Sequence, residues 1–288
     1  MSGTHFSAHQ TQLGKFKIRA LRDAAFALDG GAMFGVVPRT LWQKLTPVFD
    51  DNTIPCATNP FLIEDGTNVI VVETGLGRRW NEKQSAMFHI DHSQGHCLVE
   101  SLAQAGVDPE DVTHCLLSHA HWDHAGAACT KDGKPMFPNA EYWLAESELN
   151  ASLQADHIRR ASYRRDDVQP LVDAGLLHTF KDQQQILPGI NMKLLGGHSE
   201  GLSLITFESQ GKKAAFWADF VPTRNHVNLP YIMAYDIDAS SSYEIRKEYI
   251  PRAVEENWLC MLYHDPVAPL GYFTFDGKKY TFEALKSK

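Results

Sequence analysis

The sequence predicts an α/β protein in which helices cover the outer faces of two sheets. Short apolar runs typical of strands alternate with helical patterns in both halves of the chain. Of the 288 residues, 43% are hydrophobic and 22% are charged, which is typical of a globular protein with a sizeable core. We therefore expect one domain over residues 1–288, in which the polar residues 1–12 form a loosely ordered N-terminal segment.

The first part of the chain contains strand signals separated by glycine-rich turns. Residues 16–28 have the apolar pattern of a first strand pair, and residues 29–35 form a glycine-rich segment that we interpret as a turn. Two apolar runs, 61–63 and 69–73, flank a short polar segment and indicate a hairpin. A helical pattern over residues 97–105 ends at a glycine that is followed by Asp-Pro, a normal stop signal.

The rest of the chain continues the alternation of strands and helices. A strand is predicted over residues 112–117, and residues 145–175 are helical in character. The remaining predicted elements are strands at 192–195, 202–207, 214–217 and 258–263, and a helix at about 240–257.

A dense group of metal-compatible side chains directly follows the strand predicted at 112–117. Three imidazoles and one carboxylate occupy six consecutive positions, from His119 to His124. His119 and His121 fall on one side of an extended or tightly turned segment, while Asp123 and His124 can face a second point. Zinc, manganese and iron all accept such ligands, and imidazole is the commonest of them. The spacing therefore indicates two metal ions a few ångströms apart.

Three further candidate ligands also follow predicted strands. His198 lies in a glycine-lined turn, where small neighbours allow close approach of the backbone to a ligand, while Asp219 and His264 end later strands. Ligands of α/β proteins gather where strands end. Seven groups suit two ions, one held by His119, His121 and His198, the other by Asp123, His124 and His264, with Asp219 bridging them.

This ligand set resembles the metallo-β-lactamase superfamily, whose signature is His-x-His-x-Asp-His, then a Gly-His-Ser/Thr turn, a strand-end Asp and a strand-end His. The resemblance covers about residues 58–266 and implies a four-layer αββα sandwich. It also places Glu73 where the family has an aspartate that braces the metal-binding loop. Within the superfamily, the ligand spacing is most similar to quorum-quenching lactonases and to phosphotriesterases of the parathion-hydrolase type.

The resemblance implies a hydrolase in which a metal-bridging hydroxide cleaves an ester bond. The cofactors would be two divalent ions, zinc first, with manganese or iron as alternatives. Asp123 and Asp219 would be the catalytic carboxylates. We expect a small-molecule substrate, a lactone or another neutral carboxylic ester. Hydrolysis of a phosphotriester and metal sensing without catalysis are the alternatives.

One position departs from the lactonase pattern. Lactonases of that group place a tyrosine three residues after the bridging aspartate, whereas this chain has Pro222. Thr223, Arg224 and His226 lie just beyond and are the candidates to replace that tyrosine, with Tyr231 and Tyr235 in the same loop. His226 either contacts substrate or is an ordinary loop histidine. Trp122, which lies between ligands in the sequence, is our candidate for a pocket wall.

Composition argues against several partners. The formal net charge is -8 and no stretch gathers five basic residues, so we expect no nucleic-acid partner. No run of 18 apolar residues occurs, so we expect no membrane span. Five scattered cysteines without a Cys-x-x-Cys pair favour reduced thiols and a cytoplasmic location. The apolar residues within 33–37 suggest either a homodimer contact or a flap over the site.

Overall fold

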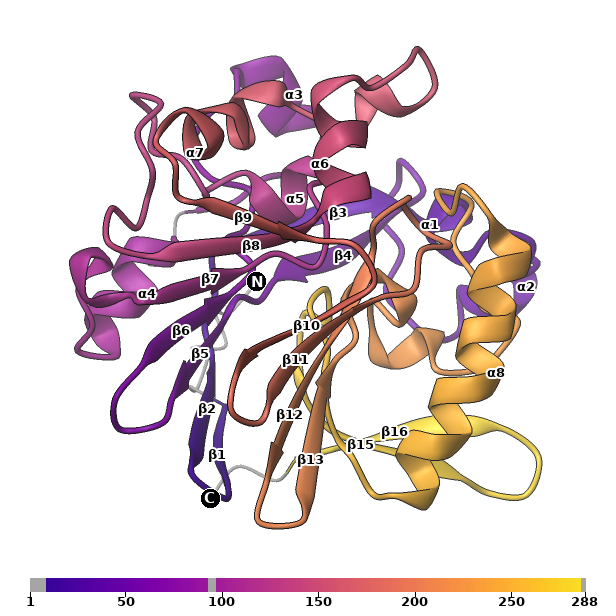
Figure 1. The fold of residues 1–288 in the computed structure, drawn as a ribbon. Helices are drawn as coiled ribbons and strands as arrows, with labels where there is room; N and C mark the ends of the chain where they lie inside the picture. The colour runs from indigo at the N-terminus through magenta and orange to yellow at the C-terminus, as the bar shows by residue number, and fades with distance from the viewer. Residues whose placement is uncertain (1–8, 93–96, 286–288) are drawn as a thin grey trace.

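Two large sheets form the centre of the molecule, and helices lie against their outer faces (Figure 1). The structure, a computed structural model, describes residues 9–92 and 97–285. Each large sheet has seven strands, and a smaller sheet has two. The predicted four-layer αββα sandwich is therefore confirmed, with the helices α4, α6 and α7 beside one sheet and α8 beside the other (Figure 1).

The first large sheet has the strand order β1-β2-β5-β6-β7-β8-β9. Its members are β1 (Gln10–Leu13), β2 (Phe16–Ala20), β5 (Phe61–Glu64), β6 (Val69–Val72), β7 (His114–Leu116), β8 (Glu141–Ala145) and β9 (Leu177–Phe180). The strands from β6 to β9 run parallel to one another. Because parallel strands end at the same edge of a sheet, the segments that follow β6, β7 and β8 are delivered to one place.

The second large sheet follows the order of the chain from β10 to β16. Its members are β10 (Gln183–Leu187), β11 (Ile190–Leu194), β12 (Ser203–Ser209), β13 (Lys212–Phe216), β14 (Leu259–Met261), β15 (Leu270–Phe275) and β16 (Tyr280–Ala284). All neighbouring pairs are antiparallel except β13 and β14, which are parallel. These two strands therefore end side by side at the same edge.

The small sheet and the helices complete the sandwich. The small sheet pairs β3 (Ala24–Asp29) with β4 (Thr53–Thr58). The helices are α1 (Gly30–Phe34), α2 (Arg39–Trp42), α3 (Glu82–Met87), α4 (Leu98–Gln104), α5 (Trp122–Ala125), α6 (Glu146–Leu153), α7 (Gln169–Asp173) and α8 (Ala239–Glu255). Short 3₁₀ turns occur at 109–111, 159–161, 165–167, 218–220 and 224–226.

The main core lies between the two large sheets. Phe61 of β5 and Phe216 of β13 are fully buried, and their rings meet edge to face with centroids 5.8 Å apart. Phe16 of β2 makes a similar contact with Phe207 of β12 at 6.0 Å. Aromatic pairs of this kind add about 0.5–1.5 kcal/mol beyond the burial of their area. They fix the position of one sheet relative to the other.

The N-terminal region differs from the prediction in two respects. Residues 10–13 form β1 and pair with β2, so this part of the segment expected to be loose belongs to the first sheet. Residues 1–8 lie outside the described residues. The region 16–28 contains two strands, as expected, but β2 and β3 join different sheets and do not pair with each other.

The glycine-rich segment 29–35 is a short helix, where we expected only a turn. The carboxylate of Asp29 accepts a hydrogen bond of 2.8 Å from the backbone N–H of Ala32 and so caps the N-terminus of α1. A Cβ at Gly30 would lie 2.4 Å from the ring of Trp42, so glycine is required for this packing. Asp29 is a typical residue for the N-terminal cap of a helix, but glycines disfavour helices, so the sequence did not indicate one here.

The region 145–175 contains two helices separated by non-helical backbone. α6 ends at Leu153, short 3₁₀ turns follow, and α7 begins only at Gln169 with Pro170 in its first turn. Proline is favoured at such a position because the missing N–H would have no helical partner. The strand β8, directly before α6, and the glutamine-rich β10 were not predicted, because neither has the alternation of a typical strand.

The segment after β13 contains His226, which packs inside the protein. Its ring is 0% exposed and stacks on Phe34 with centroids 4.4 Å apart. Nε2 donates to the carbonyl oxygen of Met33 at 3.0 Å, and Nδ1 accepts from the hydroxyl of Thr223 at 2.7 Å. Burial and the nearby Arg246 guanidinium lower the pKa of His226 to about 3, so the ring is neutral at pH 7.

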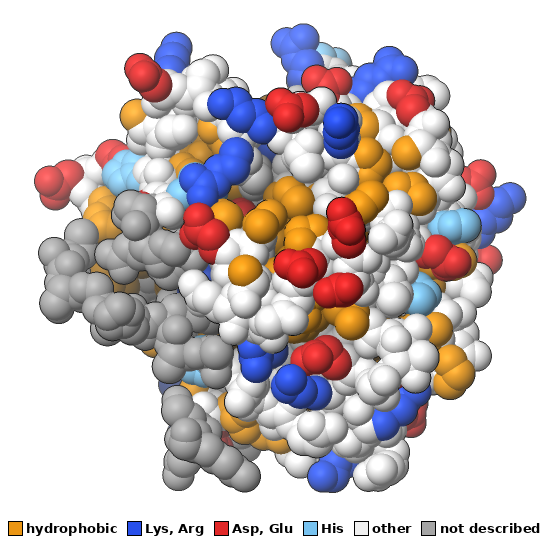
Figure 2. Space-filling model, turned by 90° about the vertical axis from the view of Figure 1, so that its left-hand side faces the viewer, with side chains coloured by type: hydrophobic (Ala, Val, Ile, Leu, Met, Phe, Trp, Pro, Cys, Tyr) orange, Lys and Arg blue, Asp and Glu red, His pale blue; other side chains and the backbone are white. Residues whose placement is uncertain are grey.

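Charged side chains of both signs are interspersed on the face shown in Figure 2. On that face, most of the Lys and Arg side chains lie close to Asp or Glu side chains. Among residues 9–92 and 97–285, every helix is too short or too polar to cross a membrane.

Replacing Phe61 tests the contact between the sheets. Phe61→Ala should lower the free energy of unfolding by about 3–5 kcal/mol, because it removes a buried ring and leaves a cavity. Phe275→Ala is the matched control, since this ring is 48% exposed. Urea titration followed by circular dichroism measures both. Equal losses in the two variants would contradict the central role of the inter-sheet core.

Replacing His226 tests its buried neutral state. The unfolded imidazole binds a proton below its ordinary pKa of 6.5, but the folded one does so only near pH 3. As the pH decreases below 6.5, the free energy of unfolding should therefore decrease, by up to about 1.4 kcal/mol per pH unit from this group. His226→Gln cannot take up this proton, so its loss of stability between pH 7 and 5 should be about 2 kcal/mol smaller. Both proteins are measured without metal. If the wild type and His226→Gln lose the same free energy of unfolding between pH 7 and 5, His226 is not buried in its neutral form.

Candidate metal centre

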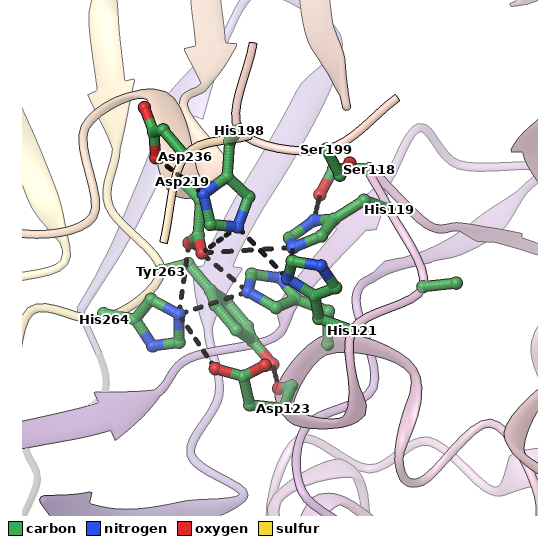
Figure 3. A network of polar contacts seen from close by, with 12 residues as sticks. Ser118, His119, His121, Asp123, His198, Ser199, Asp219, Asp236, Tyr263 and His264 are labelled. Carbon is green, nitrogen blue, oxygen red and sulfur yellow. Dashed lines mark hydrogen bonds and ion pairs between the residues drawn. The ribbon is translucent and has the colours of Figure 1, made fainter. Parts of the chain in front are cut away.

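The seven side chains predicted as metal ligands meet at one edge of the sandwich (Figure 3). Each large sheet supplies some of them: the segment after β7 and helix α5 on one side, and the segments after β11, β13 and β14 on the other. The seven residues are His119, His121, Asp123, His124, His198, Asp219 and His264. All are buried, and residues as distant in the chain as Asp123 and His264 are in contact here.

One group is formed by His119, His121, His198 and Asp219, whose ligand atoms all lie within 4.8 Å of one another. Nδ1 of His121 is 3.1 Å from Nε2 of both His119 and His198. Around a tetrahedral zinc ion with Zn–N distances of about 2.0–2.1 Å, ligand nitrogens lie roughly 3.3 Å apart. The spacing of this group therefore fits one such ion.

A second group is formed by Asp123, His124 and His264. The Nε2 atoms of His124 and His264 are 3.1 Å apart, and Oδ2 of Asp123 is 3.5 Å from Nε2 of His264. The parallel register of β13 and β14 pairs Phe216 with Met261. Asp219 and His264 each lie three residues beyond this pair, so the register itself brings them together.

Asp219 lies between the two groups and presents one oxygen to each. Its Oδ2 is 3.1 Å from Nε2 of His198, while its Oδ1 is 3.3 Å from Nε2 of His124 and 3.2 Å from Nε2 of His264. Burial alone would raise the pKa of Asp219, but the imidazoles of His124 and His264 hold it well below its usual range. Its buried Oδ1 has no hydrogen-bond donor among the described residues, a costly state that a bound cation would relieve.

Hydrogen bonds on the outer sides of the imidazoles orient their inner nitrogens. Nδ1 of His264 donates to the carbonyl oxygen of Ala57 at 2.9 Å, which leaves the Nε2 lone pair directed into the centre. Nδ1 of His198 bonds to Oδ1 of Asp236 at 2.8 Å in the same way. Asp236 lies between Tyr235 and Ile237, far from His198 in the chain, so the sequence offered no spacing signal that linked the two.

The electrostatic environment differs between the imidazoles. Burial and neighbouring imidazoles lower the pKa of His119 and His121 well below the ordinary value, which keeps them in the neutral form that binds metals. Burial also acts on His198, but the carboxylates of Asp219 and Asp236 outweigh it and raise its pKa to about 10. Since a ligand binds metal in its deprotonated form, a bound cation would displace this proton.

Glu73 reaches the metal-binding loop from the end of β6, the position that the sequence suggested. It is fully buried, and its Oε1 accepts a hydrogen bond of 2.8 Å from the backbone N–H of Ser118. Its Oε2 lies 3.6 Å from Nδ1 of His124, and neither atom has a closer hydrogen-bond partner among the described residues. The residue has a φ of 61°, an uncommon conformation for a side chain of this size.

Glu148 is a buried residue of the site that the sequence did not reveal. It lies on α6, is 0% exposed, and contacts the segments that carry His119, His121 and His198. Our helix prediction for 145–175 gave this residue no role. The missed signal is its place just after β8, at the same sheet edge as the other site residues.

A pocket of about 390 Å³ opens over the centre. Its floor includes Asp123, Asp219 and His264, and its walls include Trp122, as predicted for that residue. Other apolar wall residues are Leu28, Met33, Phe88, Ile158, Met233 and Ile237. His226 does not line this pocket: its ring is enclosed behind Phe34, which favours the alternative of an ordinary loop histidine over contact with substrate.

Comparison with solved structures supports the fold assignment. A probable metal-dependent hydrolase from Staphylococcus aureus is 28% identical and has a TM-score of 0.90 over 96% of this chain and 100% of that one. AidC, a dizinc quorum-quenching lactonase solved with a product, is 22% identical and has a TM-score of 0.79 over 98% of both chains.

Curated relatives are found at low identity. N-acyl homoserine lactonase AttM of Rhizobium radiobacter is 27% identical over 213 residues, which cover 71% of this chain and 77% of the relative. An N-acyl homoserine lactonase of Bacillus thuringiensis is 23% identical over 159 residues, 52% of this chain, and the match spans only 58% of that relative. The family model described as "Metallo-beta-lactamase superfamily" matches residues 53–256, well over half of the chain. The protein therefore belongs to the metallo-β-lactamase superfamily, as the pattern of its histidines predicted.

Proposed function

We propose that this protein is a hydrolase that uses two divalent metal ions to cleave an ester bond, with a lactone or another neutral carboxylic ester as its substrate. The observation that carries the proposal is the position of Asp219, whose two oxygens face two separate groups of imidazoles. A single ion would not require a carboxylate that points both ways. The bridging arrangement is typical of sites with two ions about 3.5–4 Å apart.

Each ligand has a role in this proposal. Two zinc ions, or manganese or iron in their place, would lower the pKa of bound water and polarise the substrate oxygen. Asp219 holds the two halves of the centre together. Asp123 reaches the pocket floor, where its carboxylate can accept a hydrogen bond from water and direct the water's lone pair toward a substrate. These two carboxylates are the catalytic residues that we propose.

The walls of the pocket favour a neutral substrate. Among the described residues that line it, Arg159 is the only Lys or Arg side chain. Its guanidinium forms ion pairs with Asp156 and Glu200, so its charge is already balanced. The apolar walls provide contacts for a hydrocarbon part of the substrate. An anionic substrate would find no unpaired cationic side chain among these wall residues.

The relatives guide the choice among neutral esters. AttM and the Bacillus thuringiensis protein are both named N-acyl homoserine lactonases, which supports a lactone as the first substrate to test. Pro222 in the tyrosine position of such lactonases argues for a different contact to the substrate carbonyl. A phosphotriesterase and a sensor without catalysis are the outcomes that would replace our proposal.

Metal removal and one ligand substitution test the proposed function. Hydrolysis of lactones and nitrophenyl esters should be lost after chelation and restored by added zinc or manganese. Asp219→Asn should lower kcat/KM at least about 100-fold and reduce the bound metal from two ions to one or none, because the amide cannot bridge with two anionic oxygens.

The same assay includes a control variant and distinguishes the results that would contradict the proposed function. Asp132→Asn, an identical change at an exposed position, should behave like the wild type. Turnover of phosphotriesters alone would move the assignment to that class. Two bound ions without turnover of any ester, lactone or phosphotriester would indicate a sensor, and turnover that survives complete metal removal would end the proposal.

Tyr235 is the pocket residue that we propose in place of the missing lactonase tyrosine. It lines the pocket, and its hydroxyl makes no hydrogen bond to another described residue. Partial burial and nearby negative charges, including Asp123, raise the pKa of Tyr235, so the phenol keeps its proton and can donate to a substrate oxygen. Tyr235→Phe should lower kcat roughly 10- to 100-fold with unchanged metal content.

Tyr231 provides the control for this prediction. It lies in the same loop and packs edge-on against Phe34 with centroids 6.0 Å apart, and it does not line the pocket. Tyr231→Phe should therefore retain kcat within a few-fold. If the two variants have equal kcat values, Tyr235 does not polarise the substrate.

A further inference from the structure

Glu148 connects three segments that surround one half of the metal centre. Its Oε1 accepts hydrogen bonds from the backbone N–H of Ala120 at 3.0 Å and from the hydroxyl of Tyr163 at 2.8 Å. Its Oε2 accepts from the hydroxyl of Ser199 and the backbone N–H of Gly201, each at 2.8 Å. Both carboxylate oxygens are therefore fully used.

Two of these partners are neighbours of metal ligands in the chain, and a third packs against a ligand ring. Ala120 lies between His119 and His121, and Ser199 follows His198. The ring of Tyr163 packs against the ring of His121, with centroids 4.8 Å apart. One buried carboxylate thus holds two loops, which come from different sheets, at the separation that their three imidazoles need.

We propose that Glu148 is a positioning residue that sets the affinity of the ion site formed by His119, His121 and His198, and leaves the other ion site unaffected. This inference rests on the proposed function, since it assumes two ions. Glu148 does not contact the reacting atoms, because Ala120, Ser199 and Tyr163 separate it from the centre. It acts through the ligands.

The backbone around Gly201 shows how closely this carboxylate is enclosed. A Cβ at Gly201 would lie 2.3 Å from Cβ of Glu148 and 2.7 Å from its backbone nitrogen, so the loop that follows His198 lies directly on α6. A glycine is needed for such an approach. The helix thereby serves as a fixed support for the loop, and the carboxylate has little freedom to move.

The other half of the centre is supported independently. The hydroxyl of Tyr263 donates to the carbonyl oxygen of Asp123 at 2.6 Å, and the hydroxyl of Thr74 donates to that of His124 at 2.8 Å. His264 is oriented by the carbonyl oxygen of Ala57, as described above. None of these hydrogen bonds involves Glu148, so a change there should affect the two ion sites unequally.

Glu148→Gln is the discriminating substitution because it preserves volume and removes half of the acceptor capacity. A glutamine has one acceptor oxygen, and its NH₂ group would face two of the four donors that the carboxylate now accepts from. The two bound zinc ions are titrated with a competing chromophoric chelator, and the absorption bands of the cobalt-loaded protein are recorded. We expect one ion to bind about 10- to 100-fold more weakly, and the other to stay within about twofold.

Glu146→Gln is the matched control. It is the same chemical change on the same helix, in a side chain that is 44% exposed. Its two zinc affinities should equal those of the wild type. In the cobalt spectra, Glu148→Gln should change the bands of one ion only, which a general loss of stability would not produce.

A milder variant covers the case in which Glu148→Gln does not fold. Ser199→Ala removes one donor on the His198 side, and the same ion should bind about 2- to 10-fold more weakly. The proposal is overturned if folded Glu148→Gln binds both ions like the wild type, or loses both equally. It is also overturned if it does not fold and Ser199→Ala binds like the wild type.

Failure of the proposed function would look different. If the wild type itself binds a single ion, the two-ion hydrolase is wrong. The positioning role of Glu148 is then wrong as well if that ion binds equally well to Glu148→Gln.

Discussion

Several carboxylates and imidazoles share a small buried volume at the edge of this sandwich, and the cost of removing them from water constrains the surrounding structure. An unpaired buried charge or hydrogen-bonding group costs several kcal/mol, roughly as much as a whole domain can spare. The fold meets this constraint with fixed partners. Asp236 and the carbonyl of Ala57 orient two imidazoles, and Glu73 supports the segment before a third. The buried ligands of the centre therefore depend on these partners as well as on one another.

The same constraint explains why the packing of the sheets matters for chemistry. His119 and His121 follow a strand of the first sheet, whereas His198 and Asp219 follow strands of the second. Their nitrogen and oxygen atoms approach to about 3 Å only if the two sheets keep their relative position. Buried rings such as Phe61 and Phe216 therefore contribute to the metal site, although they lie on the inner faces of the sheets.

The sequence predicted the site best where a short pattern, a metal-compatible residue at the end of an apolar strand, fixes a position in the fold. Residues that follow apolar strands gather at one sheet edge, and on this basis the sequence predicted that His119 and His264 belong to one site. Long-range partners carry no such signal. Glu148 is one glutamate in a helical stretch, and only the packing of α6 against two loops makes it part of the site. The two alternatives for His226 could not be separated for the related reason that the residue it packs against, Phe34, is distant in the chain.

The parallel pairing of β13 and β14 has an evolutionary consequence. The chain leaves β13 at Phe216 and returns at Leu259, and the segment between them carries pocket residues such as Tyr235 and Ile237. The strand register brings Asp219 and His264 together, and within the excursion Asp236 also serves the centre because it orients His198. Mutations and insertions elsewhere in that excursion could therefore diversify the range of accepted molecules while the reactive centre is inherited unchanged, which would let one scaffold acquire new specificities in small steps.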